Sequence, residues 1–192
     1  MTQPRWSGQS PTEHRSVFAG AARFYEDDES LARIVVDFLG AGLEAGHPAI
    51  LIATVVQRGA IVHALAARSI DVDALERTQT LALLDAAETL SAITVDGKLD
   101  ARRFRDVLRQ AVERVCRGRT GCPVRIFGQM TDVLWQRGQR DAAIQLEVFW
   151  NQLAHSEAPS ALCVYAIGHF FKQTTPPLDA AQAAERIRRA HS

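Results

Sequence analysis

Apolar and polar residues follow two kinds of pattern along this chain. Four short apolar runs are bounded by polar or turn-forming residues, as is typical of strands buried on both faces of a parallel sheet. These predicted strands cover residues 48–54, 80–85, 123–128 and 161–165. In the segments between and around them, apolar residues recur every three or four positions, which indicates amphipathic helices. The predicted helices cover residues 30–45, 59–68, 86–93, a long stretch capped by Asp100, 131–136, 141–155 and 178–190.

The alternation of strands and helices predicts the fold class. Helical connections between parallel strands are right-handed crossovers that place helices on both faces of the sheet. We therefore expect an α/β fold, a three-layer sandwich with a mainly parallel sheet. A length of 192 residues suits one such domain. Residues 1–16 are polar and contain proline, so we expect a flexible N-terminal arm followed by a single domain over residues 17–192.

Candidate ligand-binding residues follow the predicted strands. In open α/β sheets, ligands bind beyond the carboxyl ends of the strands. That rule selects Thr54, Asp85, Glu88, Gln129 and Tyr165. Three of these residues have a structural alternative: Asp85 and Glu88 resemble a helix N-cap with its capping box, and Gln129 could serve a turn.

A second candidate group lies on the predicted helix 141–155. Glu147 and Asn151 are four residues apart, so they share one face of this helix and could project toward the same edge of the sheet. Trp150 lies beside them. The alternative is a half-buried helix with Trp150 in the core.

The segment after the first predicted strand argues against tight nucleotide binding. A phosphate-binding loop at residues 53–59 would read G-x-x-x-x-G-K-S/T, but the first glycine, the lysine and the hydroxyl are missing here. The histidines lack metal-binding spacing, and no serine or cysteine has a nucleophile-elbow context. We therefore expect no catalytic residues and no metal site, and the sequence names no cofactor.

Composition narrows the classes of partner. Lys plus Arg and Asp plus Glu are both 22, so the formal net charge is zero, which argues against direct nucleic-acid binding. Three cysteines without C-x-x-C spacing suit a reducing compartment. The N-terminus lacks a signal-peptide pattern, and no apolar run is long enough to cross a membrane. We expect a cytoplasmic protein without membrane association.

An ordered series of segments resembles the MEDS domain family, which is named for the sensory domain of the dichloromethane dehalogenase repressor. The resemblance covers residues 17–192 and is carried by residues 23–28, 38–43, 49–54, 84–90, 95–97, 124–130, 134–135, 146–147, 150–153, 162–165 and 190–192. It implies a RecA- or KaiC-like core without a phosphate-binding loop, and a sensory role. Two positions depart from the family pattern: Gln129 replaces a glutamate, and Gly20 replaces a histidine.

These observations lead to one expectation and two alternatives. We expect a stand-alone sensory domain that binds a small organic ligand or a regulatory partner at the carboxyl edge of the sheet. Because no output motif is recognisable in the sequence, the partner would be a histidine kinase, a transcription regulator or an anti-sigma-type regulator. One alternative is a divergent RecA-like nucleotide-binding protein. The other is an interaction or scaffold protein without a ligand, which could be a homodimer.

Overall fold

The computed structural model describes residues 21–157 and 160–166, and these residues form a three-layer α/β sandwich. At its centre is a five-stranded sheet with the order β1-β7-β6-β2-β3, in which every neighbouring pair is parallel. The strands are β1 (Ala21–Tyr25), β2 (Ala49–Ala53), β3 (Leu81–Asp85), β6 (Arg125–Gly128) and β7 (Ser160–Ala166). A separate two-stranded hairpin pairs β4 (Thr94–Val95) with β5 (Lys98–Leu99). The predicted fold class is confirmed.

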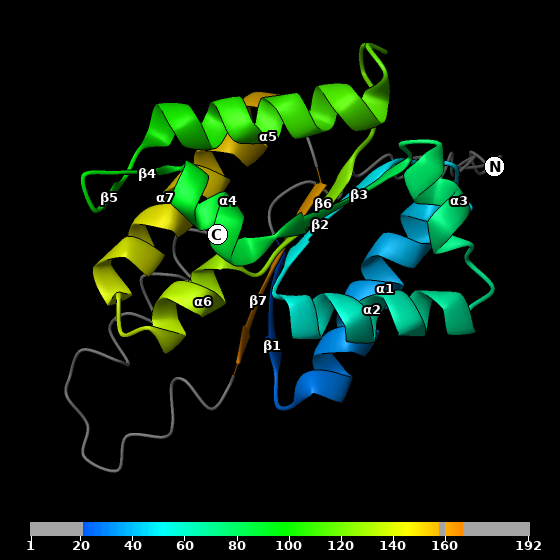
Figure 1. Ribbon diagram of the computed structural model, residues 1–192, viewed down its shortest axis with the longest axis horizontal. Coiled ribbons are helices and arrows are strands. Elements are labelled where there is room, and N and C mark those ends of the chain that lie inside the picture. The colour runs from blue at the N-terminus through cyan, green and yellow to red at the C-terminus, as the bar shows by residue number, and fades with distance from the viewer. Residues whose placement is uncertain (1–20, 158–159, 167–192) are drawn as a thin grey trace, which may run out of the picture.

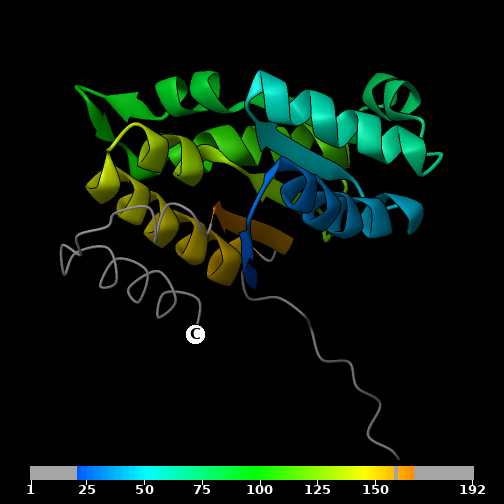
Figure 2. The same ribbon diagram turned by 90° about the horizontal axis from the view of Figure 1, so that it is seen from below.

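Helices cover both faces of the sheet. One layer contains α1 (Asp28–Glu44), α2 (Val55–Ala67) and α3 (Val72–Arg77), and the other contains α4 (Ala86–Ala92), α5 (Ala101–Cys116), α6 (Met130–Gln136) and α7 (Arg140–Glu157). Figure 1 shows the strands between these two groups. The view turned by 90° shows α1 and α2 on one side of the strands and α6 and α7 on the other (Figure 2). Within the described part of the chain, no helix is long and apolar enough to span a membrane.

The central strand β2 explains why the apolar runs are continuous. Ile50 and Ile52 pack into the core beneath α4–α7, whereas Ala49, Leu51 and Ala53 pack into the core beneath α1–α3. All five residues are fully buried. Because successive side chains point to opposite faces, a strand covered on both faces must be apolar at every position.

The observed elements agree with most of the predicted ones and differ in the places described next. The edge strand β1 was not predicted, because Arg23 interrupts its apolar run, and α3 was not predicted, because its six residues are too few to show a helical period. The helix α2 begins at Val55 rather than at residue 59. The helix predicted over residues 30–45 begins at Asp28, with Asp27 as its N-cap. The Ser30 hydroxyl accepts a hydrogen bond from the Asp27 main-chain N–H as the other half of a capping box. The predicted arm 1–16 and helix 178–190 lie outside the described residues.

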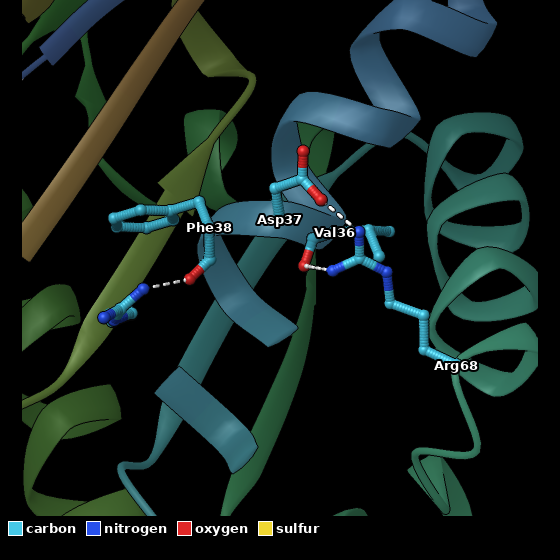
Figure 3. A network of polar contacts seen from close by, with 5 residues as sticks. Val36, Asp37, Phe38 and Arg68 are labelled. Carbon is cyan, nitrogen blue, oxygen red and sulfur yellow. Dashed lines mark hydrogen bonds and ion pairs between the residues drawn. The ribbon is translucent and has the colours of Figure 1, made fainter. Parts of the chain in front are cut away.

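Two arginines hold α1 in its layer. Arg68 follows α2 and contacts the Asp37 carboxylate, and it donates to the Val36 carbonyl oxygen at 3.5 Å (Figure 3). Arg125 on β6 donates to the Phe38 carbonyl oxygen at 2.5 Å, and its guanidinium lies 5.3 Å from the centre of the Phe38 ring. Gly42 makes room for Arg125, since a Cβ at this position would lie 2.5 Å from Arg125 Cδ. These contacts lie on the α1 layer and have a structural role.

Candidate functional site

Three of the predicted site residues follow neighbouring strands at the carboxyl edge of the sheet. Thr54 follows β2, Asp85 ends β3 and Gln129 follows β6. The register pairs Ala53 with Asp85 and Ile52 with Gly128, so the three strands end at the same level. The structure therefore brings these residues to one edge, as the sequence predicted.

Thr54 and Gln129 join the ends of β2 and β6. The Oε1 atom of Gln129 accepts a hydrogen bond from the Thr54 main-chain N–H at 3.1 Å, and the Gln129 main-chain N–H donates to the Ile52 carbonyl oxygen at 2.8 Å. The Thr54 hydroxyl in turn accepts from the Gln57 N–H at 3.3 Å and so caps α2. Gln129 is buried, with 3% of its surface exposed. Its amide therefore holds the edge together without introducing charge.

Asp85 is the N-cap of α4. Its Oδ1 atom accepts hydrogen bonds from the main-chain N–H groups of Ala87 at 2.8 Å and Glu88 at 3.0 Å. The Glu88 side chain is exposed. The capping alternative thus describes the geometry of Asp85, and a ligand contact by either carboxylate stays a prediction.

The three candidates on α7 have different environments. Glu147 is buried and accepts a hydrogen bond from the Thr131 hydroxyl on α6 at 2.5 Å. Trp150 is also buried, and its ring meets that of Phe104 edge to face at a centroid distance of 5.1 Å. Asn151 is half-buried. The helix therefore places Trp150 in the core, as the structural alternative proposed, and Glu147 between two helices.

Sequence reasoning missed a buried polar cluster at this edge. The Tyr25 hydroxyl, at the end of β1, donates to Oδ2 of Asp132 on α6 at 3.0 Å, and Gln136 Nε2 donates to the same oxygen at 2.9 Å. Tyr25 is 6% exposed and Asp132 is 2% exposed. Burial, followed by the nearby Asp132 carboxylate, raises the pKa of Tyr25 well above its usual value. One signal was present in the sequence: Asp132 is an acidic residue among apolar positions of a short helix.

A second missed contact joins α1 to α2. Gln57 Nε2 donates to Oδ1 of Asp28 at 2.5 Å. Gln57 is 8% exposed, and its Oε1 atom is buried with no hydrogen-bond partner among the described residues. Val55 and Val56, in the first turn of the same helix, are 65% and 76% exposed. This part of the edge thus combines an unsatisfied buried acceptor with exposed apolar side chains.

Tyr165, the remaining predicted site residue, lies near the carboxyl end of β7, the strand between β1 and β6. Its backbone pairs in register with Phe24 of β1. Its side chain lies outside the described part of the structure. Across residues 21–157 and 160–166, no group of three His, Cys, Asp or Glu side chains is placed to hold a metal ion.

The parallel sheet, its two helical layers and the polar side chains at its carboxyl edge define an α/β domain with its candidate site at the strand ends. A family model described as the methanogen/methylotroph, DcmR sensory domain, abbreviated MEDS, matches residues 21–183. The chain therefore belongs to the MEDS family of sensory domains, as the resemblance implied. Among curated proteins and among solved structures, nothing matches this chain. The expected likeness to RecA and KaiC stays a prediction.

Proposed function

We propose that this sensory domain binds a small polar organic ligand at the carboxyl edge of its sheet and transmits binding by protein contact, without catalysis. The observation that carries this proposal is the set of hydrogen-bonded polar side chains at that edge. Tyr25, Gln57, Gln129 and Asp132 are buried, and they bond to the half-buried Thr54 and to the exposed residues Asp28 and Gln136. Buried polar groups cost free energy unless they are hydrogen-bonded, so such a set is rarely retained for packing alone.

The hydrogen bonds at this edge connect elements of both helical layers. Tyr25 and Asp132 join β1 to α6, and Gln57 and Asp28 join α2 to α1. A ligand that donates to Gln57 Oε1, or replaces one of these partners, would change the docking of the connected helices. A change in helix docking alters the surface that a partner protein contacts, which is how a ligand shifts the population of a signalling state.

The exposed pair Val55 and Val56 complements this polar set. Ligand sites generally combine apolar walls with a few placed polar groups. A small organic molecule with one donor for Gln57 and an apolar part against these valines fits the described edge better than a nucleotide does. The phosphate-binding glycine and lysine are absent from the segment in question.

A thermal-shift screen tests the proposal. Purified protein is mixed with small organic acids, alcohols and amines, and separately with ATP and Mg²⁺. A ligand at a hundredfold excess over its Kd stabilises the folded state by about 2.7 kcal/mol, which gives a clear rise in Tm. We expect such a rise with an organic compound.

Two pairs of matched variants locate the site. Gln57→Ala and Asp132→Asn alter polar side chains at the carboxyl edge. The control variants Gln110→Ala and Asp106→Asn make the same substitutions on α5, which carries none of the polar residues named above. The edge variants should reduce the ligand-induced shift, and the α5 variants should retain it. A shift with ATP and Mg²⁺ alone would contradict the proposal in favour of the nucleotide alternative. No shift with any compound would favour a partner-binding module without a ligand.

A further inference from the structure

Two cysteines come together in the loop that follows α5, at the edge of the sheet where the strands begin. Cys116 is the last residue of α5, and Cys122 lies shortly before β6. Left-handed backbone at Arg117, Gly118 and Gly121 turns the chain back between them. The Cys122 side chain packs against the core cluster that contains Cys116, and the two thiols interact directly. The loop therefore holds two thiols side by side.

The two thiols differ in their access to solvent. Cys116 is 3% exposed, whereas Cys122 is half-buried. Burial raises the pKa of the Cys116 thiol, and the contact with Cys122 adds to that rise. Because oxidants react with the thiolate form of cysteine, Cys116 is shielded from direct attack both by its surroundings and by its bound proton. An oxidant from solution would therefore react with Cys122 first.

A cavity of about 230 Å³ opens beside Cys122. It is lined by residues 119–123, which precede β6, and by Gly46 and Pro48, which precede β2. A single water molecule occupies about 30 Å³ in the liquid, so hydrogen peroxide fits into this space. The cavity thus gives a small oxidant a path to Cys122.

Arg119 lies against both cysteines. Its Nη2 atom donates to Cys122 Sγ at 3.9 Å, and its Nε atom donates to the Cys116 carbonyl oxygen at 3.1 Å. When a thiol attacks a peroxide, negative charge develops on the oxygen that leaves. A fixed cation beside the reacting sulfur stabilises such charge. The loop therefore combines an accessible thiol, a second thiol behind it and a guanidinium next to both.

We propose that Cys122 and Cys116 form an oxidation-sensitive pair, in which hydrogen peroxide oxidises Cys122 and Cys116 then closes a disulfide. In the first step the Cys122 sulfur attacks one peroxide oxygen, the O–O bond breaks, and a sulfenic acid and one water molecule form. In the second step the Cys116 sulfur attacks the Cys122 sulfur and the S–O bond breaks. A second water molecule carries away the hydroxyl group and the Cys116 proton. The two thiols together lose two electrons, and the peroxide gains them.

The contact between the two thiols favours this disulfide over other outcomes. A neighbouring thiol reacts as an intramolecular partner, which compensates for the low thiolate fraction of Cys116. The third cysteine, Cys163, belongs to the strand β7 and not to this loop. Metal binding fits less well, because in the described part of the chain no third His, Cys, Asp or Glu completes a metal site with the pair. The pair lies at the opposite edge from the ligand site proposed above, so the two proposals are independent.

The test treats the purified full chain with hydrogen peroxide and then alkylates the remaining thiols under unfolding conditions. Trypsin cleaves after arginine, which places Cys116 in the peptide 115–117 and Cys122 in the peptide 120–125. We expect mass spectrometry to detect these two peptides joined by a disulfide, and a dithiol reductant to separate them. Protein kept under reductant should give both peptides in alkylated form.

Cysteine variants assign the two roles. In Cys116→Ala the reaction should stop at the Cys122 sulfenic acid, which a dimedone label captures. In Cys122→Ala the linked peptide should be absent, and Cys116 should still be alkylated after unfolding. Cys163→Ala keeps both thiols of the pair and should give the linked peptide as the wild type does. Since the linked peptide is measured in the wild type, the test stands even if Cys116→Ala folds poorly.

Two arginine variants test the contribution of the cation. Arg119→Ala should slow formation of the disulfide about two- to fivefold, the effect expected of an exposed charge. Its linked peptide contains residues 118–125, because one cleavage site is lost. Arg103→Ala makes the same change at an exposed position near the start of α5, roughly 20 Å along the helix from Cys116, and should leave the rate unchanged. Circular dichroism checks that both variants are folded.

Several results would overturn the proposal. Accumulation of Cys122 sulfinic acid without the linked peptide would show that Cys116 does not react with the sulfenic acid. A disulfide to Cys163, or one between two copies of the chain on a non-reducing gel, would assign the chemistry to another pair. Unmodified thiols at a peroxide concentration that oxidises glutathione would show that the oxidant does not reach Cys122. The Tm shift by a ligand at the carboxyl edge is measured separately under reductant, so failure of one proposal leaves the other intact.

Discussion

Gly128 lies against the indole ring of Trp150 at the end of β6. A Cβ at this position would lie 2.6 Å from Trp150 Cζ2, and the ring is itself packed on Phe104. Overpacking of a buried site typically costs about 1–3 kcal/mol. We expect Gly128→Ala to lower the free energy of unfolding by this amount in chemical denaturation.

The matched control is Gly59→Ala. Gly59 is exposed in α2, and a Cβ there would have no neighbour within 4 Å. Alanine has the higher helix propensity, so this change should stabilise the protein by about 0.5–1 kcal/mol. If the Gly128→Ala variant were as stable as the wild type, the Trp150 ring would be free to move away from the added methyl group.

The cysteines at the end of α5 should differ in reactivity. Burial, with a further contribution from the neighbouring Cys122, raises the pKa of the Cys116 thiol to about 12. Cys116 is 3% exposed, whereas Cys122 is half-buried. Since the thiolate is the reactive form, we expect iodoacetamide to modify Cys122 at least about tenfold faster than Cys116 at neutral pH. Peptide mass spectrometry measures both rates, and equal labelling of the folded protein would contradict the burial of Cys116.

At the scale of the element, the start of α1 should make stability sensitive to acid. The Ser30 main-chain N–H donates to Asp27 Oδ1 at 2.8 Å and lowers the pKa of that carboxyl, with the Ser30 side chain adding to the effect. The folded state therefore binds a proton less readily than the unfolded state. The stabilisation is complete above the ordinary carboxyl pKa of about 4 and is lost as the pH falls through the lower folded value.

Melting curves at several pH values test this dependence. We expect the Tm difference between the wild type and Asp27→Ala to be largest near neutral pH and to shrink in acid. Asp27→Asn keeps an acceptor but cannot titrate, so its difference from Asp27→Ala should be independent of pH. A Tm difference between the wild type and Asp27→Ala that does not change with pH would exclude a role for the charge of Asp27.

Asp85 is the N-cap of α4, and its variants distinguish a structural role of this residue from a role in ligand binding. Removing an N-cap side chain typically costs about 0.5–2 kcal/mol, so Asp85→Ala should lower the free energy of unfolding by that amount. Asp85→Ser retains a capping oxygen and should recover most of the loss. If Asp85→Ser keeps the stability but loses the response to a ligand found in the screen, Asp85 contacts that ligand.

At the scale of the whole molecule, the Tyr25–Asp132 hydrogen bond joins segments 107 residues apart in the sequence. Tyr25 ends the edge strand β1, which among the described strands pairs only with β7. Because burial raises the pKa of Tyr25, the folded state keeps the phenolic proton at a pH where the unfolded state loses it. Stability should therefore fall as the pH rises above the ordinary tyrosine value of about 10.

The variant Tyr25→Phe removes this titration. We expect it to be less stable than the wild type near neutral pH, because Asp132 loses a buried donor. Its stability should decline less between about pH 9 and pH 11 than that of the wild type. Denaturation curves across this range measure both effects. If the stability of the wild type and of Tyr25→Phe fell equally over this pH range, Tyr25 would ionise in the folded protein as it does in the unfolded chain.

The local apolar pattern predicted four of the five strands of the sheet but missed β1 and the helix α3. The run that became β2 is apolar at every position because helices cover both faces, and that condition is visible in sequence. The strand β1 carries Arg23 within its five residues, so it is not a continuous apolar run, and the six residues of α3 are too few to show a helical period. The start of α1 was predicted at residue 30 instead of Asp28, because Asp27 and Ser30 are both common capping residues and share one capping box.

The sequence by itself determined the order of the strands and helices apart from β1 and α3, the parallel sheet and the edge at which Thr54, Asp85 and Gln129 gather. These follow from short-range periodicity and from the rule that parallel strands share a carboxyl edge. Only the tertiary structure decided that Tyr25 meets Asp132, that Glu147 turns toward Thr131 and that β3 becomes the end strand of the sheet. Such contacts depend on strand order and on helix placement, which join residues far apart in the chain and leave no periodic signal along it.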